Sequence, residues 1–367
     1  MAGSRWKSII VVILAAILPL TACGADAGKT DVPEGKVKDS DTSAQWFGGY
    51  LDVTLVPRLA LEDVTVDAQS TAILSFITSH PERPCEPSWG GSYDLDQASS
   101  KLDLESQVES FRSAGNDVAV AFGGQRGMEL ALACTDGDTL RNAYAAVIDR
   151  YGLDTVDFDV EGAGAADASA AGRRAAAIAE IQAGRPADRP LKVWLTLPVS
   201  AAGLTAAAEV SVETMLKAGV ELAGINIMTM NFGPLHEGQT MLTASIGAAE
   251  GTHLTLKGLF QRHGKPLDDA ALWQKIGLTP MIGRNDVPDQ VFSPDDAEGL
   301  SAFAADRGIL RMSMWSLNRD KACHADDPAQ SANAASGICS GLDQEPGMFA
   351  RVLGRPFAGT PSPEPGA

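Results

Sequence analysis

The sequence is short of positive charge, aromatic side chains and histidine. Its 367 residues include 29 Lys or Arg against 47 Asp or Glu, which gives a formal net charge of −18 at pH 7. Such acidity argues against nucleic acid as a partner and favours a neutral or cationic substrate. Aromatic residues make up 6% of the chain, and its five histidines show neither metal-ligand spacing nor a partner serine. We therefore expect no histidine metal centre and no serine-hydrolase triad.

The sequence also lacks the usual motifs of zinc sites and of dinucleotide-binding sites. None of the five cysteines forms a Cys-x-x-Cys pair, so the sequence does not favour zinc. The stretch 162–167 (Gly-Ala-Gly-Ala-Ala-Asp) lacks the third glycine of a dinucleotide-binding turn. We expect no cofactor, no metal and a monomer. Residues 45–355 contain no Pro/Gly/Ser-rich linker and no internal repeat, which predicts one domain.

The ends of the chain have the composition of segments outside a folded domain. Residues 9–20 form an apolar run behind Arg5 and Lys7, too short to span a bilayer and typical of a signal peptide. The tetrapeptide Leu-Thr-Ala-Cys that ends at Cys23 resembles a bacterial lipobox, which implies a lipid on Cys23. Ordinary secretion with cleavage near Ala22 is the alternative.

These features predict four regions in the chain. They are a lipoprotein signal peptide over 1–22, a disordered tether over 23–44, the folded domain over 45–355 and a flexible tail over 356–367. The expected location is extracellular, on the bacterial cell surface, with the lipid as the only membrane attachment.

Four cysteines remain when Cys23 is set aside. An even number in an exported chain suggests two disulfides, with three possible pairings. Cys85 and Cys134 follow successive strand candidates, and Cys323 and Cys339 flank one C-terminal loop. We predict that these neighbours pair.

Strand-like segments alternate with helical stretches through the domain. The strand candidates are residues 50–56, 71–78, 117–122, 155–161, 192–198, 224–231, 276–282 and 310–315. Helices are expected at 101–114, 137–150, 165–184, 209–219 and 294–307. Ser293 is the expected N-cap of the last of these. The alternation predicts an α/β fold, a single-domain (β/α)8 TIM barrel, with a doubly wound sheet as the alternative.

Three carboxylates fall on one face of the fourth strand candidate. Asp157, Asp159 and Glu161 lie at i, i+2 and i+4, while the residues between them are apolar and point to the other side. Burying three acids together is costly, because like charges at close range resist joint ionisation. Proteins usually accept that cost at a catalytic site, because one acid can then stay protonated beside ionised neighbours. The pattern predicts an active site, and acids on a single strand suit a metal site less well.

Ordered motifs resemble those of family 18 glycoside hydrolases, the chitinases and their relatives. Asp154-x-x-Asp157-x-Asp159-x-Glu161 resembles the family signature Asp-x-x-Asp-x-Asp-x-Glu. Residues 122–124 resemble the Gly-Gly motif of strand three, 226–233 the Met-containing motif of strand six, and 314–320 the Trp motif of strand eight. Residues 87–91 resemble an actinobacterial branch. The resemblance covers about residues 45–355 and implies the same barrel.

The resemblance implies cleavage of β-1,4 bonds between N-acetylglucosamine units, in chitin or chito-oligosaccharides, with retention of configuration. In this family the 2-acetamido oxygen of the substrate is the nucleophile. Glu161 would be the general acid and base, and Asp159 would hydrogen-bond the acetamido N–H. Asp157 would share a proton with Asp159. Asp154 would be a structural acid at the start of the strand.

Further residues of these motifs would bind the sugar. Trp315 would form the floor of the site and stack against the ring. The other expected substrate-binding residues are Met228, Met230, Asn231, Gly123, Gly124 and Trp89. Asn231 stands where many family members have Asp, so a charge is lost there.

Two other functions share much of this pattern. A non-hydrolytic glycan-binding barrel, like the family's lectins, generally loses the acid that this chain keeps as Glu161. An endo-β-N-acetylglucosaminidase acting on N-glycans has the same signature and mechanism, and the sequence separates it poorly from a chitinase.

Overall fold

The computed structural model describes residues 45–64, 71–328, 332 and 334–357. The chain divides into two units, Met1–Thr42 and Ser43–Ala367, and every described residue lies in the second. The expectations for residues 1–44, including Cys23, and for 358–367 lie outside the described residues. Phe357 is described and buried, so the packed part of the chain continues past residue 355.

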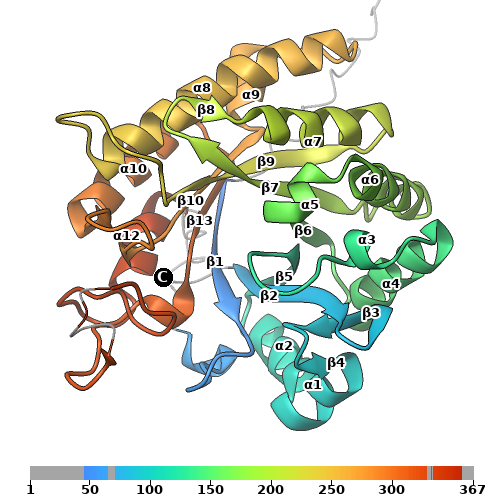
Figure 1. The fold of residues 1–367 in the computed structure, drawn as a ribbon, viewed down its shortest axis with the longest axis horizontal. Coiled ribbons are helices and arrows are strands. Elements are labelled where there is room, and N and C mark those ends of the chain that lie inside the picture. The colour runs from blue at the N-terminus through green and yellow to red at the C-terminus, as the bar shows by residue number, and fades with distance from the viewer. Residues whose placement is uncertain (1–44, 65–70, 329–331, 333, 358–367) are drawn as a thin grey trace, which may run out of the picture. The chain divides into compact units, whose positions relative to one another are not determined.

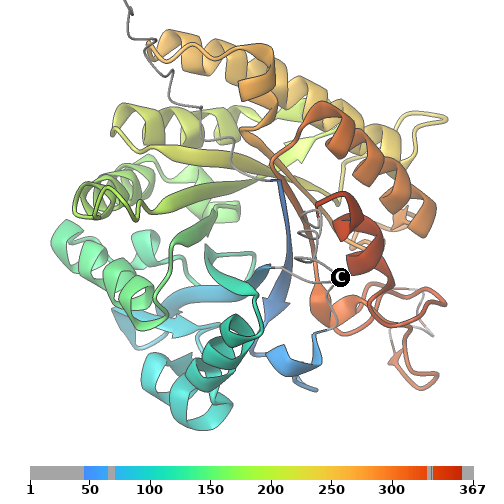
Figure 2. The ribbon, with the colours of Figure 1, turned by 180° about the vertical axis from the view of Figure 1, so that it is seen from behind.

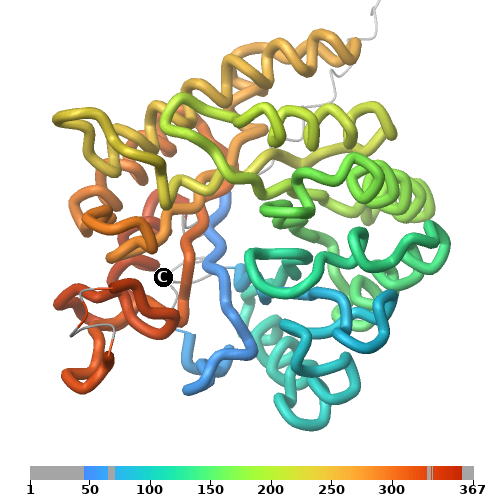
Figure 3. Tube along the Cα trace, viewed as in Figure 1, coloured from blue at the N-terminus to red at the C-terminus, as the bar shows by residue number. Residues whose placement is uncertain are grey.

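Eight parallel strands close into a barrel. They are β1 (Trp46–Asp52), β2 (Thr71–His80), β5 (Asp117–Gly123), β6 (Thr155–Asp159), β7 (Lys192–Ser200), β9 (Leu222–Thr229), β10 (Ile276–Pro280) and β13 (Arg311–Met314). Strand β1 pairs in parallel with both β2 and β13, so the ring has no open edge. Figure 3 traces this closure, with the first and last strands side by side. The predicted (β/α)8 barrel is confirmed, and each predicted strand overlaps one of the eight.

Helices surround the barrel on the outside, as the two opposite views show (Figures 1 and 2). The longer ones are α1 (Leu95–Leu102), α2 (Leu104–Ser113), α4 (Gly137–Arg150), α6 (Ala168–Ala183), α7 (Ala206–Lys217), α8 (Met241–Arg262) and α10 (Pro294–Arg307). Shorter ones are α3 (Leu130–Ala133), α5 (Gly162–Ala166), α9 (Asp269–Trp273) and α12 (Met348–Gly354). No helix in the described part of the chain has the length and apolarity that a membrane span needs.

Small elements extend the barrel ends. The short strands are β3 (Arg83–Trp89), β4 (Tyr93–Asp94), β8 (Gly203–Leu204), β11 (Gly283–Arg284) and β12 (Val291–Phe292). The 3-10 turns are η1 (Leu61–Asp63), η2 (Leu317–Arg319) and η3 (Arg355–Phe357). Strand β3 runs antiparallel to β2, and β4 antiparallel to β3, so a hairpin is added outside the closed ring.

Local signals explain several element boundaries. The Ser293 hydroxyl accepts a hydrogen bond from the Asp296 backbone N–H, which caps α10 as predicted. The single helix expected over 101–114 is instead two helices, because the chain breaks at Asp103, where φ is 53°. The disulfides join Cys85 to Cys134 and Cys323 to Cys339, the pairing expected from the sequence.

Candidate active site

A cavity of about 220 Å³ opens where the barrel strands end at their carboxyl termini. This is smaller than the roughly 300–1,000 Å³ of pockets that enclose a drug-sized ligand. Among the predicted site residues, its lining contains Asp159, Glu161, Met228, Met230, Asn231 and Trp315. It also contains residues that the sequence did not single out, chiefly Tyr50, Phe76, Gln125, Thr196, Thr279, Met281 and Asp286.

The side chains of strand β6 alternate between the inside and the outside of the barrel, as the sequence predicted. Asp157 and Asp159 face the barrel interior, while the ring of Phe158 stacks on Phe122 at 5.0 Å and meets Tyr144 of α4 edge-on at 5.2 Å. This apolar packing on the outer side fixes the strand, and therefore the direction of both carboxylates.

Asp157 lies at the bottom of the site, and hydrogen-bond donors surround its carboxylate. Its Oδ2 accepts from the Tyr50 hydroxyl at 2.6 Å, and its Oδ1 accepts from Thr196 Oγ1 at 2.6 Å and from Arg311 at 2.9 Å. Three donors, one of them a cation, thus occupy both oxygens of this carboxylate. The described structure contains no hydrogen bond between Asp157 and Asp159. Asp157 instead pairs with Arg311, and the sharing of a proton between Asp157 and Asp159 stays a prediction.

Arg311 is the buried cation beneath the site. Its side chain is 0% exposed and its guanidinium also donates to the Tyr50 hydroxyl at 2.9 Å and to Ser313 at 2.8 Å. The guanidinium carbon lies 5.2 Å from the ring centroids of both Trp46 and Trp194. These aromatic faces and hydrogen bonds compensate the charge that burial would otherwise make costly.

Asp159 is buried directly below the cavity. Its Oδ1 has no hydrogen-bond partner in the described structure. Burial raises the pKa of Asp159 well above its ordinary value, and the charges of Glu161 and Asp157 raise it further, while Arg311 acts in the opposite direction. Burial thus favours the protonated form of Asp159, and its unpartnered oxygen is available to a ligand.

Glu161 follows the last residue of β6 with an extended backbone, φ −137° and ψ 173°. The pairing of β6 with β7 continues through the Val160 N–H, which donates to the Thr196 carbonyl at 2.9 Å, and this keeps Glu161 on the cavity side. Burial raises the pKa of Glu161 from 4.5 to about 7. A carboxyl with this pKa can both give and take a proton near neutral pH.

Three aromatic rings meet at the cavity floor. Trp315 stacks on Phe76 with ring centroids 5.5 Å apart and lies 6.0 Å from Tyr50. All three line the cavity, and Trp315 keeps part of its surface exposed. A partly exposed indole held by two neighbouring rings offers a rigid apolar face to a sugar ring.

Gly123 and Gly124 support the site without lining its cavity. Gly124 N–H donates to the Asp159 carbonyl at 3.1 Å, and a Cβ on Gly123 would lie 2.1 Å from that same oxygen. Gly123 also has φ +101°, which side chains other than hydrogen disfavour. The expectation that both glycines bind substrate is corrected: they let β5 approach the backbone of Asp159.

Replacing Gly123 by Ala is expected to displace the end of β6. We expect a loss of about 1–3 kcal/mol in the free energy of unfolding, from the unfavourable φ and the clash. Catalytic activity should fall as well, because the Asp159 backbone must move. Urea unfolding and initial rates measure both effects. Gly172→Ala is the matched control, since Gly172 is exposed on α6 with open space around its Cα and should be neutral or slightly stabilising. Equal effects of the two substitutions would contradict this role.

Trp89 is not a sugar-binding residue. Its side chain is 0% exposed at the end of β3, and its indole N–H donates to the Tyr151 hydroxyl at 3.0 Å. The glycines that follow it, Gly90 and Gly91, turn the chain from β3 into β4 and leave the indole pointing into the core. The expectation that Trp89 binds substrate was therefore wrong.

Asp154 lies at the beginning of β6, outside the cavity. Its carboxylate forms ion pairs of 2.6 Å with both Arg185 and Arg189, and its carbonyl accepts from Lys192 N–H at 2.8 Å. These contacts tie β6 to the start of β7.

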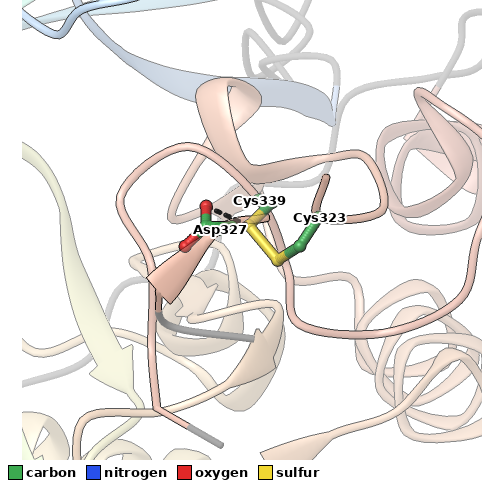
Figure 4. A group of neighbouring side chains, drawn as sticks. All are labelled: Cys323, Asp327 and Cys339. Carbon is green, nitrogen blue, oxygen red and sulfur yellow. Dashed lines mark hydrogen bonds between the residues drawn. A yellow bond between two sulfur atoms is a disulfide. The ribbon is translucent and has the colours of Figure 1, made fainter. Parts of the chain in front are cut away.

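A cluster of Cys323, Asp327 and Cys339 has residue types typical of a metal site (Figure 4). The two sulfur atoms are bonded to each other in a disulfide, so neither is a thiolate that could bind an ion. The cluster belongs to the loop after η2.

Among the residues of the site that sequence reasoning missed are Tyr50, Phe76, Thr196, Asp286 and Arg311. One signal was available for Arg311, the single charge in a mostly apolar strand candidate. The others lie on strands or loops far from β6 in the sequence. Nothing in the composition of their own segments distinguishes them from ordinary structural residues.

No protein-family model matches the sequence. The "Probable bifunctional chitinase/lysozyme" of Escherichia coli (strain K12) is 31% identical over 284 residues, which are 75% of this chain and 31% of that protein. "Endochitinase 11" of Metarhizium anisopliae is 33% identical over 223 residues, 59% of this chain and 42% of that protein. The chain thus spans about a third to two fifths of the length of these curated relatives.

A solved structure also matches the fold. It is active domain 2 of the thermostable chitinase from Pyrococcus furiosus, studied as catalytic-site mutants complexed with chito-oligosaccharides. The TM-score is 0.72 with 27% sequence identity, over 87% of this chain and 97% of that chain. The similarity therefore extends over the whole barrel.

Proposed function

We propose that this chain acts as a glycoside hydrolase of family 18, the family that its chitinase relatives and the chitinase structures support. From that premise, its substrate is chitin or chito-oligosaccharides, and it cleaves β-1,4 bonds between N-acetylglucosamine units. The observation that carries the proposal is the cavity in which Glu161, with its raised pKa, stands beside buried Asp159 and the Trp315 floor.

Glu161 is the proton donor of the proposed reaction. In the first step its carboxylic acid protonates the leaving glycosidic oxygen, while the acetamido oxygen of the substrate attacks the anomeric carbon and forms an oxazolinium ring. In the second step the Glu161 carboxylate takes a proton from the water that opens this ring. The configuration at the anomeric carbon is retained because inversion occurs twice.

Asp159 orients the nucleophile. Its unpartnered Oδ1, buried under the cavity, accepts the acetamido N–H of the sugar and so turns the acetamido oxygen toward the anomeric carbon. When positive charge develops on the oxazolinium ring, the Asp159 carboxyl group that accepts the acetamido N–H would stabilise it electrostatically. Asp157 lies below, paired with Arg311.

Trp315 holds the ring of the same sugar. The apolar face of its indole packs against the sugar ring and the acetamido methyl group, and Met228 and Met230 line the cavity beside it. The proposed substrate therefore meets an apolar floor and a polar wall in one small cavity.

The rate of chitotetraose hydrolysis should fall as pH rises above about 7. Glu161 must carry its proton to act as acid, and its pKa is raised by burial to about 7, so the protonated form predominates below that pH. Above it kcat/KM should drop by about tenfold per pH unit. Initial rates from pH 4 to 10, with products separated by mass spectrometry, measure the profile. A rate that stays constant between pH 7 and 9 would contradict the role of Glu161.

The same assay tests the substrate. Chitobiose and other short products from chitotetraose are expected. Cleavage of an N-glycan core but not of chitotetraose would instead identify an endo-β-N-acetylglucosaminidase, and binding without cleavage would identify a lectin-like barrel.

A further inference from the structure

The side chain of Asn231 is fully engaged with a loop of the protein. Its Oδ1 accepts the backbone N–H of Asp286 at 2.8 Å and that of Val287 at 3.3 Å. Its Nδ2 donates to Asp286 Oδ2 at 3.0 Å, and its backbone N–H donates to Asn285 Oδ1 at 3.0 Å. Asn231 also has φ +48°, a conformation that Asn tolerates better than most residues. The amide therefore holds the segment between β11 and β12 in place.

This engagement brings the Asp286 carboxylate to the catalytic cavity. Asp286 lines the cavity that contains Asp159 and Glu161, and it also lines a neighbouring cavity of about 170 Å³. Its Oδ2 accepts from Asn231, whereas no described donor contacts its Oδ1. The Asp286 side chain is exposed and lines both cavities, and its Oδ1 can accept a further hydrogen bond there.

Among the described residues, three carboxyl groups but no basic side chain line the catalytic cavity. The nearby guanidinium of Arg319 donates to the backbone carbonyls of Ile282 and Arg284, at 2.9 and 2.6 Å. The guanidinium therefore serves the fold. Arg319 and Asp286 line the neighbouring cavity together and their charges attract, but the described structure forms no direct ion pair between them. A sugar in the cavity offers hydroxyl and amide N–H donors, which are the groups that a free carboxylate oxygen accepts.

We propose that Asp286 is a substrate-binding residue that accepts a hydrogen bond from the sugar in the catalytic cavity, and that Asn231 is the residue that positions it. This inference rests on the proposed function for the identity of the sugar. Asn231 thus contributes through the loop it holds, and the negative charge in this part of the site is carried by Asp286.

Asp286→Asn removes the charge and keeps the shape of the side chain, so it tests the carboxylate itself. We expect kcat/KM on chitotetraose to fall about tenfold or more, because a charge-assisted hydrogen bond becomes a neutral one. In a Glu161→Gln background, where binding is measured by calorimetry without turnover, the Kd for chitotetraose should rise by a similar factor. Asp289→Asn is the matched control, since Asp289 is exposed on the same loop and has a positive φ that Asn tolerates. It should retain the parent kcat/KM.

Asn231→Ala tests the positioning role. It should lower kcat/KM to the level of Asp286→Asn, and the double variant Asn231→Ala/Asp286→Asn should lose no more than either single one. This non-additivity distinguishes positioning from a general loss of stability, which would add to the effect of the second substitution.

The outcomes separate the two proposals. If the parent cleaves chitotetraose and Asp286→Asn keeps the parent kcat/KM and Kd, the role of Asp286 is overturned while the proposed function stands. If the losses of Asn231→Ala and Asp286→Asn add, the positioning role of Asn231 is overturned. If the parent neither cleaves nor binds chitotetraose, the proposed function fails and the inference about Asp286 fails with it.

Discussion

Replacing Glu161 by Gln is expected to lower the rate of chitotetraose hydrolysis by about 10²- to 10⁴-fold, the usual contribution of a general acid and base. The amide has nearly the shape of the acid but no proton to give to the glycosidic oxygen. Binding should persist, because Trp315, Asp159 and Asp286 still line the cavity. Initial rates and calorimetric titration with chitotetraose give the two quantities. Glu298→Gln, on the exposed side of α10, is the control that should keep the parent rate.

The same substitution should stabilise the folded protein at alkaline pH. The unfolded chain loses the Glu161 proton near the ordinary value of 4.5, whereas burial raises the pKa in the folded protein to about 7. Between these values the folded state binds more protons, so the parent loses stability as pH rises through this window. Gln does not titrate, and its unfolding midpoint should exceed that of the parent at pH 8. A variant that is inactive and also less stable at pH 8 would point to misfolding rather than to loss of the acid.

Replacing Arg311 by Met is expected to lower the free energy of unfolding by about 3–5 kcal/mol, as when one partner of a buried ion pair is removed. Met keeps much of the stem volume, but the Asp157 carboxylate would remain buried without its cation. Arg311→Lys should also destabilise, because an ammonium cannot reach Asp157, Tyr50 and Ser313 together as the planar guanidinium does. Urea unfolding followed by circular dichroism gives the free energies.

A double variant decides whether the Asp157 charge is the cause of that loss. Asp157→Asn removes the charge that Arg311 compensates, so Arg311→Met/Asp157→Asn should be less destabilised than the sum of the two single variants. If the single effects add, the ion pair is not coupled. The loss would then come from the packing of the guanidinium between Trp46 and Trp194.

The barrel was predictable from the sequence because its signals are local. Each strand candidate is a short run of β-forming residues, and helices of ordinary length separate the candidates. The alternation of these elements and their spacing along the chain are therefore enough to predict the closed barrel. The spacing of Asp157, Asp159 and Glu161 likewise places them on one side of β6 without any knowledge of the rest of the chain. These predictions depend on residues that are neighbours in the sequence.

The partners of those acids were not predictable, since they come from distant strands. Arg311 is 154 positions from Asp157, and Tyr50 is 107 positions from it. Only closure of the barrel, with β1 between β13 and β2, brings both beneath β6. The pairing of Asp157 with Arg311 therefore became visible only in the structure.

Trp89 and Asn231 show how a local pattern can mislead. Trp89 was expected to bind substrate, but the extra hairpin of β3 and β4 turns its indole inward instead. Asn231 suggested the loss of a charge from the site, yet its amide holds another carboxylate, Asp286, at the same cavity. In both cases the deciding contact is made by a segment that the strand pattern does not predict.

The most direct test of the central claim is proton NMR of chitotetraose hydrolysis during the first minutes, before the product anomers equilibrate. Retention through an oxazolinium ring predicts that new reducing ends appear as the β-anomer, and that this signal is absent with Glu161→Gln. Products that appear first as the α-anomer would contradict the account, because they require direct attack of water with inversion. So would β-anomer formed by Glu161→Gln at the parent rate.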